Sequence, residues 1–232
     1  MENGTTGGGR GRRASDRGRY GKLNRERVML SALEVVDRDG LSGLSMRRLG
    51  AELGVEAMAL YRYAPGKDAL LDGLVEAFAL ELEHELGEPV PGRWRAELHR
   101  IALATYRVAL RHPNVVPLLA TRLLSTPLAR RPEAVLRGDE RILGLLAEAG
   151  TDDRGAVAVH RAFTAWLLGF LIVELRAMDD APEEPDPAFR LGLHRISATD
   201  LPHLRATAPA MVERGGPEAL AAGLDALLDR IA

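Results

Sequence analysis

The sequence predicts an all-α protein with a small helix-turn-helix domain followed by a larger helical domain. Apolar residues recur at three- and four-residue spacing along most of the chain, and no stretch alternates as a β-strand would. No internal repeat of about 20 to 50 residues is present. We expect a basic, disordered arm over 1–22, a helix-turn-helix domain over 23–66, and a helical body over 67–232.

Composition excludes several classes of protein. The chain has 232 residues and no cysteine, which rules out a disulfide framework and a thiol nucleophile. The glycine- and arginine-rich beginning does not resemble a signal peptide. The longest apolar run, 162–173, is shorter than the roughly 20 residues that a membrane span needs. We therefore expect a cytoplasmic protein without a membrane partner.

Charge is divided unevenly along the chain. Residues 1–67 hold 13 Lys/Arg and 8 Asp/Glu, a net charge of +5, and the remainder carries −7. Such an asymmetry is typical of a head that binds a polyanion and a body that does not. The arm over 1–22 is too polar and glycine-rich to bury a core. It is expected to neutralise phosphates or to enter a minor groove beside the main reader.

The first helices have clear start and stop signals. Asn24 is a suitable N-cap for a helix over 25–39, and Gly40 ends it. Ser45 is the next N-cap, for a helix over 46–53, and Gly54 makes the turn into a third helix over 57–63. Pro65 and Gly66 then break the pattern.

The body continues as longer helices. A helix over 67–86 is followed by a boundary rich in glycine and proline over 87–92. Further helical patterns are predicted over 94–111, 115–124, 128–149, 152–178, 189–198 and 217–231, and the acidic, proline-rich stretch over 179–187 is predicted to be a solvated loop. The apolar helix around Phe163 and Trp166 is hydrophobic on nearly every side, so it must be buried from two directions. A partner subunit would supply the second direction.

The segment 45–67 has the shape of a device that reads DNA. Leu49, Leu53 and Leu60 would pack two short helices together across the turn at Gly54. Tyr61 and Tyr63 bring hydroxyls that can donate to phosphates. Lys67 lies at a helix N-terminus, where its charge and the helix dipole both favour an anion.

This segment resembles the N-terminal domain of TetR-type repressors. The matching residues are Ser45, Leu49, Leu53, Gly54, Val55, Leu60, Tyr61, Tyr63, Lys67, Leu70 and Leu71. The resemblance implies that the helix over 57–63 enters the major groove and that the positions near Lys67 hold the DNA backbone. The DNA-binding residues expected on these grounds are Arg47, Ala57, Met58, Ala59, Tyr61, Arg62, Tyr63 and Lys67.

Base reading is expected to rest on few polar contacts. Where the tetracycline-repressor branch has polar side chains, this chain has Ala57, Met58 and Ala59, which favour apolar contact with thymine methyl groups. Arg47 and Arg62 are the candidates for guanine.

The body resembles the tetracycline-repressor branch as well, through the stretches 93–119, 165–175 and 219–231. The resemblance implies an effector pocket, and a homodimer joined by the helix over 152–178 and the last helix as a four-helix bundle. In that branch a histidine on the helix matching 115–124 binds the magnesium of the drug complex. The stretch 115–121 has no histidine, so a larger apolar effector is expected in place of tetracycline, with no cofactor and no metal. The expected pocket residues are His99, Leu103, Tyr106, Pro117, Leu118, Thr121, Arg122, His160, Phe163 and Trp166.

Two other interpretations remain open from the residues alone. An architectural protein would use the same head to bind DNA with little sequence preference. A helical enzyme would need a buried acid–base pair, and the sequence shows no Gly-x-Ser-x-Gly, Walker or paired Glu-x-x-His motif. The preferred prediction is a repressor that binds a pseudo-palindromic operator as a homodimer and is released by a small molecule.

Overall fold

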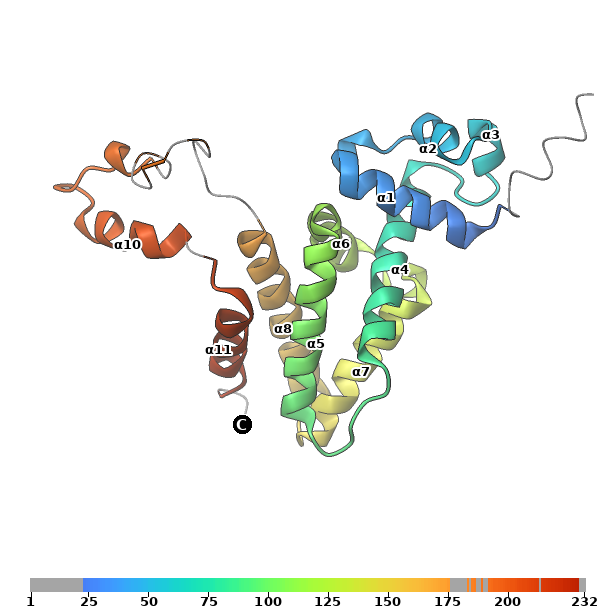
Figure 1. Cartoon of the computed structure of the whole chain (residues 1–232). Helices are drawn as coiled ribbons and strands as arrows, with labels where there is room; N and C mark the ends of the chain where they lie inside the picture. The colour runs from blue at the N-terminus through green and yellow to red at the C-terminus, as the bar shows by residue number, and fades with distance from the viewer. Residues whose placement is uncertain are drawn as a thin grey trace, which may run out of the picture.

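A computed structural model describes residues 23–175, 183, 185–186, 189, 192–212 and 214–229. Every regular element in this part is helical, which confirms the predicted all-α class (Figure 1). The predicted arm over 1–22 and most of the predicted loop over 179–187 lie outside the described residues. The α-helices are α1 (Arg25–Gly43), α2 (Met46–Leu53), α3 (Ala57–Leu60), α4 (Lys67–Leu86), α5 (Trp94–Arg111), α6 (Val116–Ser125), α7 (Glu133–Glu148), α8 (Asp153–Glu174), α10 (Pro202–Val212) and α11 (Gly216–Leu228).

Local capping explains how the head begins and turns. The Asn24 side chain accepts a hydrogen bond of 2.8 Å from the backbone N–H of Arg27, and Ser45 caps α2 in the same way. Gly40, with φ of 72°, interrupts α1 one turn before its end, and Gly54 adopts the left-handed conformation after α2. Asn24, Ser45 and Gly54 act as the sequence predicts, whereas Gly40 kinks α1, which continues to Gly43 instead of ending at residue 39.

The third helix is shorter than predicted. α3 ends at Leu60, and residues 61–63 form a turn instead of the helical end expected up to Tyr63. The carbonyl of Leu60 accepts from both Tyr63 and Ala64, which tightens the chain before Pro65. Helix propagation would have to stop here in any case, because a residue that precedes proline disfavours the helical conformation.

α4 belongs to both parts of the molecule. Its first half packs against α1, where Gly73 lets the helices approach so closely that a Cβ atom would lie 2.1 Å from the Met29 sulfur. Its second half lies in the body against α5 and α7 (Figure 1). A displacement of α4 therefore moves the head relative to the body.

α8 is covered on one side only. It packs against α6, α7 and α11 within the chain, and Phe163 and Leu171 are fully buried there. Val157 and Val173 on its other side are about half exposed. α8 is also the one helix among the described residues that is long and apolar enough to cross a membrane by length and composition, but a buried helix of a soluble protein passes the same test.

Three predicted boundaries are corrected by the structure. The helix predicted over 128–149 is divided, because Pro132 leaves only a 3₁₀ turn at Leu128–Arg130 before α7. α6 begins after a second such turn at Pro113–Val115. The helix predicted over 189–198 is reduced in the described residues to a 3₁₀ turn at Leu193–Arg195, whereas α10 was not predicted. α10 carries Pro209 and lacks a continuous apolar stripe, so its pattern is weak.

A glycine in α2 offers a test of the helix-turn-helix packing. A Cβ atom at Gly50 would lie 2.8 Å from the carbonyl oxygen of Val55, a backbone atom that cannot move aside cheaply. Gly50→Ala is therefore expected to destabilise the protein by about 1–3 kcal/mol in urea unfolding. The control is Gly138→Ala in α7, where a Cβ meets nothing and the change should stabilise by up to about 1 kcal/mol. Equal stability of the two variants would contradict the packing described.

Candidate functional site: a DNA-reading head and a cavity in the body

The head presents a small outward surface on α2 and α3. Leu49, Leu53 and Leu60 point into the core of the head, as expected for the residues that join the two helices. Met58 is 78% exposed and Tyr61 is 44% exposed. Arg47 is exposed as well, so charged and apolar groups lie side by side where the recognition helix would enter a groove.

Tyr63 has a structural contact that the sequence did not predict. Its hydroxyl donates a hydrogen bond of 2.5 Å to the backbone carbonyl of Leu23, which ties the turn after α3 to the start of α1. The guanidinium of Arg62 lies 4.6 Å from the centre of the Tyr63 ring. The expected donation from Tyr63 to a phosphate would require breaking the bond to Leu23. Tyr61 keeps an exposed hydroxyl and is the better candidate for that contact.

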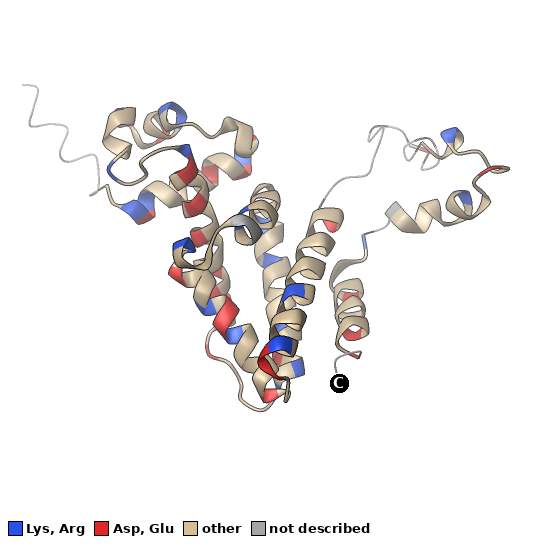
Figure 2. Ribbon diagram, turned by 180° about the vertical axis from the view of Figure 1, so that it is seen from behind, with Lys and Arg blue, Asp and Glu red and all other residues tan. Residues whose placement is uncertain are grey.

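Lys67 is the first residue of α4 and is exposed. Gly66 precedes it with φ of 143°, a conformation that directs the chain out of the head and into the helix. Acidic residues follow along α4 from Asp68 onward (Figure 2). Within α4, Lys67 is therefore the one lysine or arginine, and it lies at the end nearest the head.

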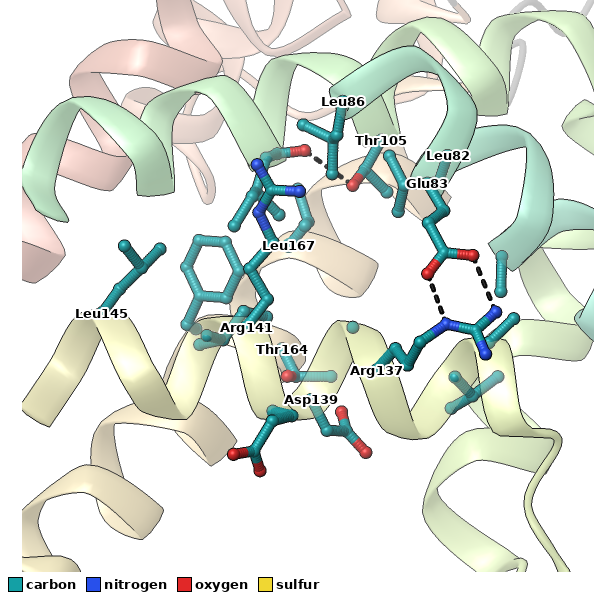
Figure 3. Close-up of a pocket in the computed structure, with 18 of the residues that line it drawn as sticks. Leu82, Glu83, Leu86, Thr105, Arg137, Asp139, Arg141, Leu145, Thr164 and Leu167 are labelled. Carbon is teal, nitrogen blue, oxygen red and sulfur yellow. Dashed lines mark hydrogen bonds and ion pairs between the residues drawn. The ribbon is translucent and has the colours of Figure 1, made fainter. Parts of the chain in front are cut away.

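The body contains a cavity of about 750 Å³, partly open to solvent, between α4, α5, α6, α7 and α8. This volume lies within the range of ligand pockets for drug-sized molecules. The walls are mainly apolar, and α7 forms one side of the space (Figure 3). The apolar residues that line it include Val75, Phe78, Leu82, Leu86, Ile101, Leu119, Leu123, Val135, Ile142, Leu145, Phe163, Leu167 and Leu168.

Few polar groups interrupt these walls, and most are already paired. Arg137 of α7 donates two hydrogen bonds to the Glu83 carboxylate, at 2.5 and 2.9 Å (Figure 3). The hydrogen bond from Arg137 holds the pKa of Glu83 below its ordinary value. Arg141 is directed to the carbonyl of Gly87 and to the buried carboxylate of Glu97.

Two hydroxyls in the lining are available to a ligand. Thr105 donates to the carbonyl of Ile101 and keeps its lone pairs for an incoming donor. Thr164 is in the lining of the same cavity, and Figure 3 draws it on the side of Asp139, away from Thr105. The cavity can thus accommodate a mainly apolar ligand and orient it with a small number of hydrogen bonds.

One of the ten residues predicted for the pocket, Phe163, lines this cavity. His99 and Leu103 line a smaller cavity of about 290 Å³ between α5 and α11, where His99 contacts Asp225 at 2.9 Å. Tyr106 and Trp166 pack on either side of Phe170. The other five lie outside the larger cavity: Pro117, Leu118, Thr121, Arg122 and His160.

Three of those five have identifiable partners. The hydroxyl of Thr121 donates to backbone carbonyls one turn earlier in α6. His160 contacts Asp139 at 3.0 Å. Arg122 bridges two carboxylates of α4, Asp68 at 2.6 Å and Asp72 at 2.7 Å, and these contacts raise the pKa of Arg122. Arg122 therefore links α6 to the first turns of α4.

Sequence reasoning missed the polar residues of α7 that line the cavity. Arg137, Arg141 and Leu145 are each four residues apart and so share one helix face, a pattern that is visible in the sequence. The spacing of residues within one helix does not show which other helix this face packs against. Arginines on a helix surface are usually solvated, so they were not selected as pocket residues.

Comparison with known proteins identifies both parts of the chain. Residues 29–74 match the family described as bacterial regulatory proteins, tetR family. Residues 86–232 match the tetracyclin repressor-like C-terminal domain. The first match ends within α4 and the second begins at its last residue, so α4 spans the boundary between the two matched parts.

Individual relatives agree with the family matches. The transcriptional repressor DrrR1 of Streptomyces coeruleorubidus is 36% identical over 161 residues, which are 68% of this chain and 56% of that protein. The class C tetracycline repressor of Escherichia coli is 30% identical over 85% of both chains. The structure of ActR from Streptomyces coelicolor, in complex with actinorhodin, is 25% identical with a TM-score of 0.73 and covers 90% of this chain and 95% of that one.

The helix-turn-helix, the shared helix α4 and the cavity in the body therefore agree with the sequence matches. The chain belongs to the TetR family of bacterial transcriptional regulators and has a tetracycline-repressor-like C-terminal domain.

Proposed function

We propose that this protein is a transcriptional repressor that binds a pseudo-palindromic operator as a homodimer and leaves it when a small molecule fills the body cavity. Regulators of the TetR family are generally not enzymes, and the proposed function needs no reaction. It would act in the cytoplasm, where the DNA is.

The observation that carries this proposal is the position of α4. Lys67, at the N-terminus of α4, lies at the edge of the head, whereas Phe78 and Leu82 of the same helix line the cavity. A ligand that fits the cavity better when α4 is displaced would stabilise a conformer with the head in a different orientation. DNA would favour one position of α4 and the ligand would favour the other. The coupling free energy between them is set by how strongly the affinity of each differs between the two positions.

The cavity favours an effector with a large apolar ring system. Its lining is dominated by leucine, isoleucine, valine and phenylalanine, with hydroxyls from Thr105 and Thr164. ActR, which shares the fold over most of this chain, was crystallised with actinorhodin. We infer a polycyclic aromatic effector that carries hydrogen-bonding oxygen atoms, and actinorhodin is a suitable first probe.

Arg122 is proposed to transmit ligand binding from α6 to α4. Leu119 and Leu123 line the cavity, and Arg122 lies between them with its guanidinium on Asp68 and Asp72. Arg122→Met should leave the cavity intact. In the wild type, the effector is expected to bind the free protein more tightly than the DNA-bound protein, and the variant should reduce this ratio of affinities by roughly fivefold. Arg130→Met, at an exposed arginine in the turn before α7, is the control. Titration of effector against free and DNA-bound protein measures this ratio, and equal ratios in both variants would rule out the role of Arg122.

The exposed face of α8 supports a homodimer. Val157 and Val173 flank a surface of small residues on α8, and α11 lies beside it with Ala222 and Ala226 exposed. Apolar area of this kind is normally covered in a soluble protein. A second copy would cover it with the same two helices in a symmetric interface.

Selection of bound sites from a random DNA pool tests the proposed function. The expected result is a pseudo-palindrome whose half-sites are separated by about one helical turn. Strong salt dependence without any consensus would instead favour an architectural DNA-binding protein.

A further inference from the structure

His112 connects the head to the body through both of its ring nitrogens. It follows α5, and its side chain is only 13% exposed. Nδ1 lies 2.7 Å from the Asp37 carboxylate of α1, in the head. Nε2 lies 2.8 Å from the Glu81 carboxylate of α4, in the body. One imidazole thus lies between acidic groups from the two parts of the protein.

Both ring nitrogens lie within hydrogen-bond distance of a carboxylate oxygen. Where both carboxylates are ionised they can only accept, so both nitrogens of His112 would donate and the ring would be an imidazolium. The charges of the surrounding cluster agree. Arg111 pairs with Glu81 and Glu85, and Arg107 pairs with Glu85. The cluster therefore holds three carboxylates, from Asp37, Glu81 and Glu85, and two guanidiniums. An imidazolium at His112 would make its positive and negative charges equal in number.

Asp37 depends on this contact more than Glu81 does. Glu81 also accepts a hydrogen bond of 2.6 Å from Arg111. The second oxygen of Asp37, Oδ1, is buried without a hydrogen-bond partner, so the Asp37 carboxylate is stabilised through the oxygen that faces His112. Asn114, two residues after His112, donates its amide to the backbone carbonyls of Val36 and Asp37. Side chains at 112 and 114 therefore hold the same turn of α1.

We propose that His112, as an imidazolium, is a positioning residue that holds the DNA-binding head in its operator-binding orientation, so that operator affinity falls when His112 loses its proton. The proposal rests on the proposed function of DNA binding. The sign follows from the contacts, because the protonated ring bonds both carboxylates and the neutral ring can donate to only one. The neutral ring would leave Asp37 or Glu81 facing a nitrogen lone pair.

The test uses the full chain and a DNA site selected from a random pool. Between pH values of about 6 and 8.5, wild-type affinity is expected to fall roughly fivefold or more. His84→Gln, which alters an exposed histidine of α4, should show the same fall. His112→Gln should bind weakly at both pH values, and His112→Lys, which keeps the charge, should bind well with little pH dependence. The rescue by lysine separates a charge-dependent role from a purely structural one.

A second measurement needs no DNA. Nitrogen-15 NMR of the imidazole in the free protein should show both His112 nitrogens protonated at neutral pH. A neutral ring there, or a His112→Gln variant with the pH dependence of the wild type, would overturn the proposal. A chain that bound no DNA at any pH would overturn the proposed function, while the ring-nitrogen spectrum would still decide the state of His112.

Discussion

Gly144→Trp is expected to leave operator binding intact while abolishing release by the effector. Gly144 lies on α7 in the lining of the cavity, and a Cβ atom there would meet nothing within 4 Å. Gly144 is exposed at the open side of the cavity, so an indole there has room to cover the cavity without displacing the backbone. Because it would occupy volume that the effector needs, the effector concentration for half-release of DNA should rise roughly a hundredfold or more.

The matched control for Gly144→Trp lies one turn away on the same helix. Ala147 is exposed on α7 and does not line the cavity, so Ala147→Trp adds the same group outside it. The control should respond to effector like the wild type. Normal release by the Gly144→Trp variant would mean that the effector binds elsewhere in the body.

Lys67→Ala is expected to weaken binding to every DNA sequence by a similar factor. Its ammonium group at the start of α4 is placed to meet a backbone phosphate, which carries no sequence information. Removal from both protomers should lower affinity by roughly tenfold or more and reduce the slope of log affinity against log salt by about one per lost contact. Arg93→Ala, in the loop between α4 and α5 at the end of the body far from the head, removes the same charge as a control (Figure 1).

Arg47→Ala should behave differently from Lys67→Ala. Arg47 is exposed on α2 beside the recognition surface, where a guanidinium can read guanine. Its loss should relax the preference at one base pair per half-site, by about 1–3 kcal/mol, and change binding to random DNA little. Fluorescence anisotropy on the selected site and on a scrambled site measures both effects. An equal loss on the two DNAs would show that Arg47 contacts phosphate.

Local signals explain why the boundaries of the head were predictable. Asn24 and Ser45 are N-caps whose side chains satisfy free backbone N–H groups, and this chemistry needs only a few consecutive residues. Gly40 and Gly54 adopt positive φ values that other residues avoid. Each of these features is decided within one helical turn, so the sequence contains the information in readable form.

The lining of the cavity could not be predicted in the same way. Helical periodicity shows which residues of α7 share a face, but the identity of the facing helix depends on contacts between distant parts of the chain. Arg122 and Asp68 are 54 residues apart, as are Arg137 and Glu83. Tyr63 was assigned to phosphate because its partner, the carbonyl of Leu23, is 40 residues away and carries no side-chain signal. For this reason the sequence predicted the helix caps of the head better than the lining of the cavity.

The central claim, that the effector moves two recognition helices relative to each other, can be measured directly. The chain has no cysteine, so Leu30→Cys places one spin label per protomer on an exposed residue of α1, in the head but outside the residues proposed to contact DNA. Pulsed dipolar spectroscopy then reports the distance between the two labels of the dimer. We predict one distance distribution for the free and DNA-bound protein and a different mean distance with saturating effector. An unchanged distribution in a sample from which the same effector has released the DNA would contradict the account.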